Sequence, residues 1–240
     1  GQGSVAPDAI ALPVGRRGAI APKTAAQANY LSLLSQCELT FGVGPAGTGK
    51  TFLAAAYGAS LLRRGQVDRL VITRPAVEAG EKLGFLPGDL NEKVDPYLAP
   101  IWEALNDILG PDDVRRRRDK GEIEAAPIAF MRGRTLAHAF IIVDEAQNTS
   151  RLQMKMVLTR LGEGARMVVT GDPSQVDLLN PRDSGLKHAL RILEDVKGVG
   201  VQRFEAQDVV RHAMVERIVR AYDADAASRR PAADLEDPDS

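Results

Sequence analysis

The feature of this sequence that most constrains its fold is a glycine-rich turn, GPAGTGKT at residues 44–51, which joins two segments of different periodicity. It follows the apolar run Leu39–Val43 and opens a segment whose apolar positions Leu53, Tyr57 and Leu61 have helical spacing. The turn satisfies the pattern G-x-x-x-x-G-K-[ST], which binds phosphate when a strand precedes it and a helix follows. A glycine-rich turn without this role would match by chance in roughly one chain in a hundred. The sequence therefore predicts a phosphate-binding loop.

The residues of this loop have separate expected roles. Glycines let backbone N–H groups surround phosphate oxygens, and the N-terminus of the following helix adds partial positive charge. Lys50 is expected to reach the β- and γ-phosphate oxygens, and the Thr51 hydroxyl is expected to ligate Mg²⁺. The expected nucleotide-binding residues are Gly44, Pro45, Ala46, Gly47, Thr48, Gly49, Lys50 and Thr51.

Short apolar runs alternate with segments of helical period along the chain, which predicts an α/β fold. The runs are apolar almost throughout, as in a parallel sheet with helices on both faces. The expected strands are Leu39–Val43, Arg69–Thr73, Pro127–Met131, Phe140–Val143, Met167–Thr170 and Val199–Phe204.

Two segments show an apolar helical stripe that predicts packing on a sheet face. One contains Met154, Val157, Leu158 and Leu161, after a capping box at Ser150 and Gln153. The other contains Val215, Ile218, Val219 and Tyr222. These elements predict a domain over residues 22–223, with a flexible segment at 1–21, an edge insertion at about 84–126 that includes a helix around Ile101–Leu109, and a disordered tail at 224–240.

Paired carboxylates end the apolar run Phe140–Val143. Asp144 is expected to hold the Mg²⁺ shell, and Glu145 to orient a water molecule against the γ-phosphate. A kinase would not need this second carboxylate. The alternative is that both acids only cap the following helix, although Ser150 could cap it without them.

A second apolar run ends in Gly171-Asp172, with Gln175 three residues further on. If this strand lies beside those ending at Val43 and Val143, all three bring polar residues to one carboxyl edge, where such folds bind ligands. Gln175 would then face the γ-phosphate, where its amide can accept from water and donate to a phosphate oxygen. The alternative is an Asx turn in which Asp172 bonds the following backbone and Gln175 is solvated.

Charge and cysteine content limit the function classes. The 31 basic and 32 acidic residues nearly balance, so a nucleic-acid contact would need a local basic patch. One cysteine, Cys37, excludes an internal disulfide and a cysteine-cluster metal site. The chain lacks an apolar run of the length of a membrane span and lacks a signal-like start, so we expect a cytoplasmic protein with no membrane association.

Several motifs carry a resemblance to known families. Thr73-Arg74-Pro75, Asp144-Glu145-Ala146-Gln147 and Gly171-Asp172-x-x-Gln175 resemble motifs Ia, II and III in the first RecA-like domain of superfamily 1 helicases. Longer blocks within residues 22–222 resemble the PhoH family of P-loop ATPases, among them GPAGTGKTFLA, MRGRTLAHAFIIVDEAQN, QMKMVLTRLGEGARMVVTGDPSQVDL and DVVRHAMVERIVRAY. The chain departs from that family at 177–181, where Asp-Leu-Pro is more usual.

This resemblance implies a RecA-like P-loop ATPase that uses ATP and Mg²⁺ and assembles as a homo-oligomeric, hexameric ring. It also implies an association with RNA or with phosphate starvation, and a ribonuclease as a partner, since some members of the family are fused to or partnered by ribonucleases. Gln27, upstream of the loop, aligns with a family glutamine whose amide can pair with adenine N6 and N7. The alternative is a solvated helix residue.

The resemblance does not identify the arginine that would complete the ATP site. Superfamily 1 helicases complete the ATP site with arginines from a second RecA-like domain, but only 65 residues follow Gln175, too few for another domain of ordinary size. A neighbouring subunit can supply such an arginine in trans. Arg211, at the start of the last helical segment, is the candidate, and pairing with Asp208 at i, i+3 is the alternative.

The sequence favours an RNA-linked ATPase over three other classes. A nucleotide-binding switch would bind without phosphate release. A small-molecule kinase would need an acceptor pocket and an arginine lid, neither of which is evident. An AAA+ chaperone would need a helical lid domain after the sheet.

Overall fold

The computed structural model describes residues 20–75, 98–211 and 213–228. The chain divides into two compact units, one ending at Val209 and the other beginning at Val210. Residues 1–19 of the predicted segment 1–21 and residues 84–97 of the predicted insertion lie outside the described residues. Within the described residues, no helix has the length and apolar character to cross a membrane.

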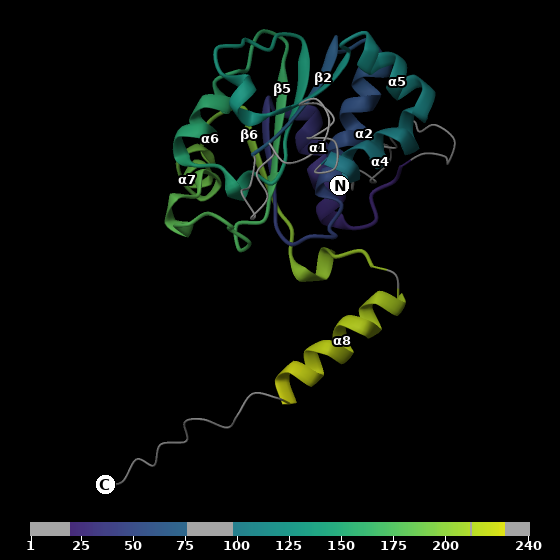
Figure 1. The fold of residues 1–240 in the computed structure, drawn as a ribbon, viewed down its shortest axis with the longest axis vertical. Coiled ribbons are helices and arrows are strands. Elements are labelled where there is room, and N and C mark those ends of the chain that lie inside the picture. Colours follow the sequence, from purple (N-terminus) through teal and green to yellow (C-terminus); the bar gives the residue numbers. More distant parts are fainter. Residues whose placement is uncertain (1–19, 76–97, 212, 229–240) are drawn as a thin grey trace, which may run out of the picture. The chain divides into compact units, whose positions relative to one another are not determined.

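A six-stranded sheet forms the centre of the first unit, with the order β3-β2-β4-β5-β1-β6 (Figure 1). All of its pairings are parallel. The strands are β1 (Leu39–Val43), β2 (Arg69–Arg74), β3 (Ile123–Pro127), β4 (Ala139–Val143), β5 (Arg166–Gly171) and β6 (Val199–Arg203). The central strands β1 and β4 are buried at every position, as the continuous apolar runs predict.

Helices cover both faces of the sheet. On one face the core contains side chains from α1 (Ala25–Gln36), α2 (Lys50–Arg63), α4 (Ala99–Leu109) and α5 (Pro111–Asp119). On the other it contains side chains from α6 (Arg151–Leu158) and α7 (Gly185–Leu193). The predicted α/β class, with a parallel sheet between two helical layers, is confirmed.

Two reciprocal hydrogen bonds fix the start of α6. The Ser150 side chain accepts from the Gln153 backbone N–H, and the Gln153 side chain accepts from the Ser150 backbone N–H, so the predicted capping box is present. Met154 and Val157 on this helix are buried, as the stripe predicts, whereas Leu161 lies beyond the helix in an isolated bridge with Leu136.

The strand predicted at Pro127–Met131 is wrong. The strand is β3, which ends at Pro127, and the following apolar residues form the 3₁₀ helix η3 (Ile128–Met131). Ile128 and Met131 are buried in the core without belonging to the sheet, because a short apolar run is compatible with either structure.

The part of the predicted insertion that the structure describes contributes to the core. The strand β3 pairs with β2 at the edge of the sheet. Ile101, Leu105 and Ile108 of α4 are buried in the same cluster as α2. The predicted helix around Ile101–Leu109 is confirmed.

The second unit contains α8 (Ala213–Ser228). The predicted helix is confirmed, and it continues past Ala224, the predicted start of the tail. Its apolar stripe is not buried within its own unit: Val215, Ile218 and Tyr222 are 44%, 48% and 75% exposed.

Candidate functional site

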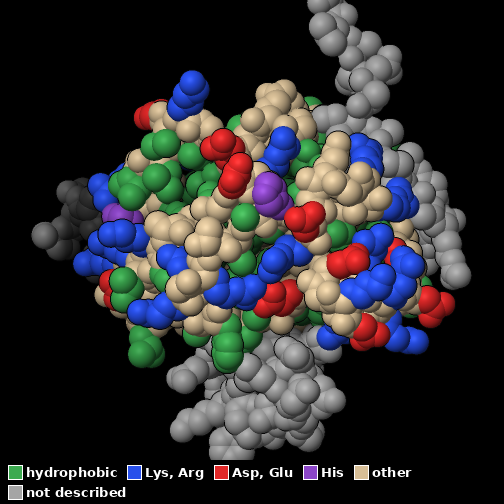
Figure 2. Space-filling view, turned by 90° about the horizontal axis from the view of Figure 1, so that it is seen from above, with side chains coloured by type: hydrophobic (Ala, Val, Ile, Leu, Met, Phe, Trp, Pro, Cys, Tyr) green, Lys and Arg blue, Asp and Glu red, His purple; other side chains and the backbone are tan. Residues whose placement is uncertain are grey.

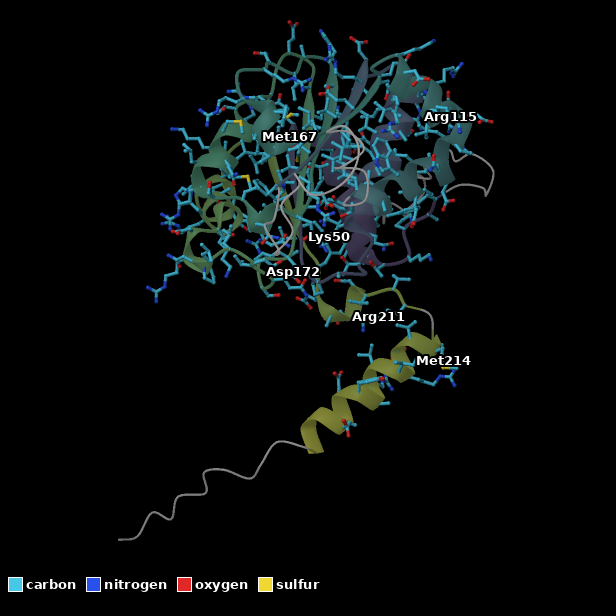
Figure 3. The ribbon with its side chains drawn as sticks, in the orientation of Figure 1. Lys50, Arg115, Met167, Asp172, Arg211 and Met214 are labelled. Carbon is cyan, nitrogen blue, oxygen red and sulfur yellow. The ribbon has the colours of Figure 1, made fainter. Side chains whose placement is uncertain are left out.

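The parallel register brings three strand ends together. Val43 of β1 is paired with Gly171 of β5, and Val143 of β4 is paired with Val169 of β5. The residues that follow these strands therefore meet at the carboxyl edge of the sheet. Lys50 and Asp172 lie at this edge, and Met167 lies toward the opposite one (Figure 3).

The glycines of the 44–51 loop are required by its path. Gly49, which precedes α2, has φ 83°, a left-handed conformation that other residues rarely adopt. A Cβ atom at Gly44 would lie 2.3 Å from the backbone oxygen of Phe204, and one at Gly49 would lie 2.8 Å from Gln27 Nε2. Side chains at Gly44 and Gly49 would therefore clash with their neighbours, and glycine at both positions lets the loop backbone follow this path.

Lys50 begins α2 at the end of this loop and is largely buried, with the residue as a whole 9% exposed. Its Nζ donates to the Pro45 carbonyl at 2.8 Å, so it has a partner within the loop. Burial lowers the pKa of Lys50, and the carboxylates of Asp144, Asp172 and Glu145 oppose that shift. A cation in such a position is ready to exchange the carbonyl for a phosphate oxygen.

Asp144 has the contacts expected of a Mg²⁺ ligand. Its Oδ1 accepts from the Thr51 hydroxyl at 3.0 Å and from the Thr170 hydroxyl at 2.7 Å. A carboxylate beside a loop hydroxyl fits a small hard cation, which takes few protein oxygens when phosphates supply others. No group of three or more His, Cys, Asp or Glu side chains forms a separate metal site among the described residues.

Glu145 adopts an unusual backbone conformation. Its φ of 51° is left-handed, which for a residue other than glycine costs on the order of 1 kcal/mol. Its carboxylate lies 3.5 Å from an Arg74 nitrogen and accepts from Gln147 Nε2 at 2.6 Å. The strained turn and these two contacts direct the second carboxylate into the edge where Asp144 lies.

Gln147 is a site residue that the sequence reasoning did not single out. Its Nε2 donates to Glu145, and its Oε1 accepts from the Asp172 backbone N–H at 3.1 Å. The amide therefore links the residues after β4 to those after β5. The only sequence signal was its place in Asp144-Glu145-Ala146-Gln147, the motif quoted for the helicase resemblance.

The turn after β5 combines both readings of its sequence. Asp172 Oδ1 accepts from the Ser174 backbone N–H at 2.9 Å, so the Asx turn is present. Gln175 is exposed but lines the same cavity as Lys50 and Glu145. The structure thus places the Gln175 side chain where a terminal phosphate could reach it.

Gln27 is buried rather than solvated, so the solvated-helix alternative is wrong. Its Nε2 donates to the Thr48 carbonyl at 3.0 Å, and its Oε1 accepts from the Lys23 backbone N–H at 2.7 Å. This amide joins the start of α1 to the loop. Contact with adenine remains a prediction.

The loop and the polar residues that follow β4 and β5 line one cavity of about 250 Å³. Its lining includes Gly47, Gly49, Lys50, Thr51, Asp144, Glu145, Gln147, Asp172 and Gln175. Arg211, the predicted trans arginine, is exposed and belongs to the second unit, so its role stays a prediction. The alternative partner, Asp208, accepts from the Glu205 backbone N–H.

A strand, a glycine loop with a buried lysine, and a carboxylate beside the loop threonine define a parallel α/β protein with a P-loop at the carboxyl edge of its sheet. The sequence of the chain matches the family model for PhoH-like protein over residues 19–223. The chain therefore belongs to the PhoH-like protein family, and the predicted resemblance is confirmed.

Relatives in this family are closely similar. The PhoH-like protein of Synechocystis sp. is 54% identical over 218 residues, which are 90% of this chain and 66% of that protein. The PhoH-like protein of Bacillus subtilis is 52% identical over 84% of this chain and 63% of its own length. Protein PhoH of Escherichia coli is 44% identical over 85% of this chain and 58% of its own length. The chain thus spans less than two thirds of the length of these relatives.

Solved structures give more distant matches. The UvsW helicase from bacteriophage T4 aligns with TM-score 0.48 and 8% identity, over 78% of this chain and 62% of the helicase. The Sulfolobus solfataricus SWI2/SNF2 ATPase core aligns with TM-score 0.40 and 16% identity, over 67% of this chain and 35% of that chain. The assignment of the fold rests on the sheet and the loop rather than on these alignments.

The contact between Gln27 and the loop predicts a stability effect. Gln27→Ala should lower the free energy of unfolding by about 1–3 kcal/mol, because it leaves the Thr48 carbonyl without its partner. Gln36→Ala, on the exposed end of the same helix, is the control and should change it by about 0.5 kcal/mol or less. Urea unfolding without nucleotide measures both, and equal small changes would contradict a role of Gln27 in holding the loop.

Proposed function

We propose that this protein binds ATP with Mg²⁺ and hydrolyses it. The observation that carries the proposal is the single cavity lined by Lys50, Thr51, Asp144 and Glu145. Lys50, Thr51 and Asp144 are the groups needed to hold a nucleoside triphosphate and its Mg²⁺. Glu145 is a carboxylate that can orient a water molecule for attack. A protein that only held the nucleotide would not need this fourth group.

Each side chain has a part in the proposed reaction. Lys50 would leave the Pro45 carbonyl and bind β- and γ-phosphate oxygens, where its charge favours the transition state. Thr51 and Asp144 would hold Mg²⁺, which when bound neutralises phosphate charge. Glu145 would orient the attacking water, and Gln147 and Arg74 would fix the position of its carboxylate.

We further propose that the active form is a homo-oligomeric, hexameric ring in which Arg211 of one subunit completes the site of the next. The missing transition-state cation supports this proposal, because the cavity lining includes Lys50 as its only basic residue among the described residues. A closed ring is the economical way to give each subunit the same neighbour.

The proposed biological role is RNA remodelling or processing in the cytoplasm, with a ribonuclease as partner. This role rests on the family resemblance, since the 31 basic and 32 acidic residues give the chain no overall positive field to attract RNA. A comparison of the ATPase rate with and without single-stranded RNA tests it directly.

Substitutions of Lys50 and Glu145 should impair different steps, ATP binding for Lys50 and turnover for Glu145. Lys50→Ala should weaken ATP binding about tenfold or more, because it removes the cation facing the phosphates. Glu145→Gln should preserve binding and lower kcat by about 10²–10⁴-fold, because an amide is a poor base.

Nucleotide affinity and phosphate release measure these two effects, with Glu163→Gln, an exposed residue outside the cavity, as the control. Equal loss of binding in both variants would contradict the separate roles. Tight ATP binding without phosphate release by the unaltered protein would instead show a nucleotide-binding switch.

Gln175 should act mainly on turnover. Gln175→Ala should lower kcat by about tenfold or more with little change in ATP affinity, because the amide would contact the γ-phosphate and water rather than the loop-bound phosphates. Gln66→Ala, another exposed glutamine, is the matched control. A rate equal to that of the control would leave Gln175 as a solvated turn residue.

The trans arginine predicts complementation between inactive subunits. Arg211→Ala should lower the hydrolysis rate by about 10³-fold or more. Mixing Lys50→Ala with Arg211→Ala subunits should partly restore ATP hydrolysis, because some interfaces then combine an intact loop with an intact Arg211. Co-assembly without any recovery, or full activity in a monomer, would reject this arrangement.

A further inference from the structure

The helix α8 presents an apolar stripe that its own unit does not bury. Val215, Ile218 and Tyr222 lie at helical spacing and are 44%, 48% and 75% exposed. The described residues of the second unit consist almost entirely of this helix. A single helix of 16 residues is only marginally stable in water, so its stripe requires an apolar partner.

The first unit carries an apolar groove of about 730 Å³ between α6 and α7. Its lining includes Leu152 and Ile192, which are 70% and 52% exposed, together with Leu158 and Val196. On the side of α6 and α7, hydrophobic side chains lie among Lys and Arg side chains (Figure 2). Isolated exposed apolar residues are ordinary, but a lined groove marks an interaction surface.

The two surfaces have complementary charge. The groove lining contains Arg151, Lys155 and Lys197 but a single carboxylate, Glu38. On a helical wheel, Glu216 and Asp223 of α8 flank one side of the stripe. Acidic side chains beside the stripe would therefore face basic side chains at the rim of the groove.

The lengths of the two surfaces also agree. The stripe from Val215 to Tyr222 rises about 10 Å along the helix axis. The helix α6 has 8 residues and is therefore about 12 Å long. One α8 stripe can thus fill the groove lengthwise.

The path of the chain favours a second copy as the source of the helix. The groove reaches Leu39 and Val199, at the amino ends of β1 and β6. Val209 lies at the opposite edge, where its Cγ1 is 3.3 Å from the Cβ position of Gly47. Residues 210–212 can extend only about 14 Å, which limits how far α8 of the same chain can reach toward the Leu39 and Val199 end of the groove.

We propose that the groove between α6 and α7 binds α8 of a second copy of this chain. Because the stripe and the groove are different surfaces of one molecule, the contact can join subunits head to tail. It would be the contact that holds the proposed oligomer together, and in that respect it rests on the proposed self-association. It does not depend on ATP hydrolysis.

The test changes each surface separately and measures the oligomeric state by sedimentation across a concentration series. Ile218→Glu alters the stripe and Ile192→Glu alters the groove, and each should weaken self-association about tenfold or more by placing a charge in the apolar contact. Phe130→Glu is the matched control, since Phe130 is 54% exposed and lies outside the groove lining. Leu152→Glu replaces Ile192→Glu if thermal unfolding shows that the latter is poorly folded.

A mixture of the two variants gives the decisive result. The Ile218→Glu chain keeps its groove and the Ile192→Glu chain keeps its stripe, so together they should form a one-to-one complex that neither forms alone. Association that persists in both single variants would overturn this contact while leaving another ring interface possible. A wild-type chain that stays monomeric at every concentration, as it would if α8 covered its own groove, would overturn it as well.

Discussion

The carboxylate of Asp144 joins the parts of the molecule on which the site depends. One oxygen of this buried side chain accepts from Thr51 at the start of α2 and from Thr170 in β5. These contacts are possible only because β5 lies between β1 and β4 in a parallel sheet, so that three chain segments end at one edge. A carboxylate in this place would be costly to bury without such donors. The fold and the site therefore constrain each other.

One strained residue lies directly beside this carboxylate. Glu145 is held in the left-handed region, where a side chain costs free energy that the surrounding contacts must offset. Gln147 supplies two of the offsetting contacts, one to the Glu145 carboxylate and one to the Asp172 backbone. Buried amides that satisfy both a side chain and a backbone group restrict a turn more than either contact alone. The carboxylate of Glu145 is thus positioned by the ends of two neighbouring strands.

The sequence predicted those features that depend on local pattern and parallel topology. The loop at 44–51, the pair Asp144 and Glu145, and five of the strands follow from such patterns. The strand β3 did not, because IEAAP is a half-buried edge strand and the run after it is more apolar. Gln147 was missed because its importance comes from contacts across β4 and β5, which no local spacing encodes. Gln27 was ambiguous for the same reason, since its partner Thr48 is distant in the sequence.

The helix α8 shows where hydrophobic periodicity stops being informative. Apolar residues at i, i+3, i+4 and i+7 identify the side of a helix that is buried. The spacing does not say whether that side packs on a sheet face of the same chain or in a groove of another chain. Within its own unit the stripe stays exposed at Ile218 and Tyr222, whereas Met154 and Val157 of α6 are buried in the core of the first unit. An apolar stripe that extends over two turns of a helix is usually buried against another element. Its regularity therefore argues for a partner rather than for a tail, and the basic rim of the groove between α6 and α7 gives that partner a matching chemistry.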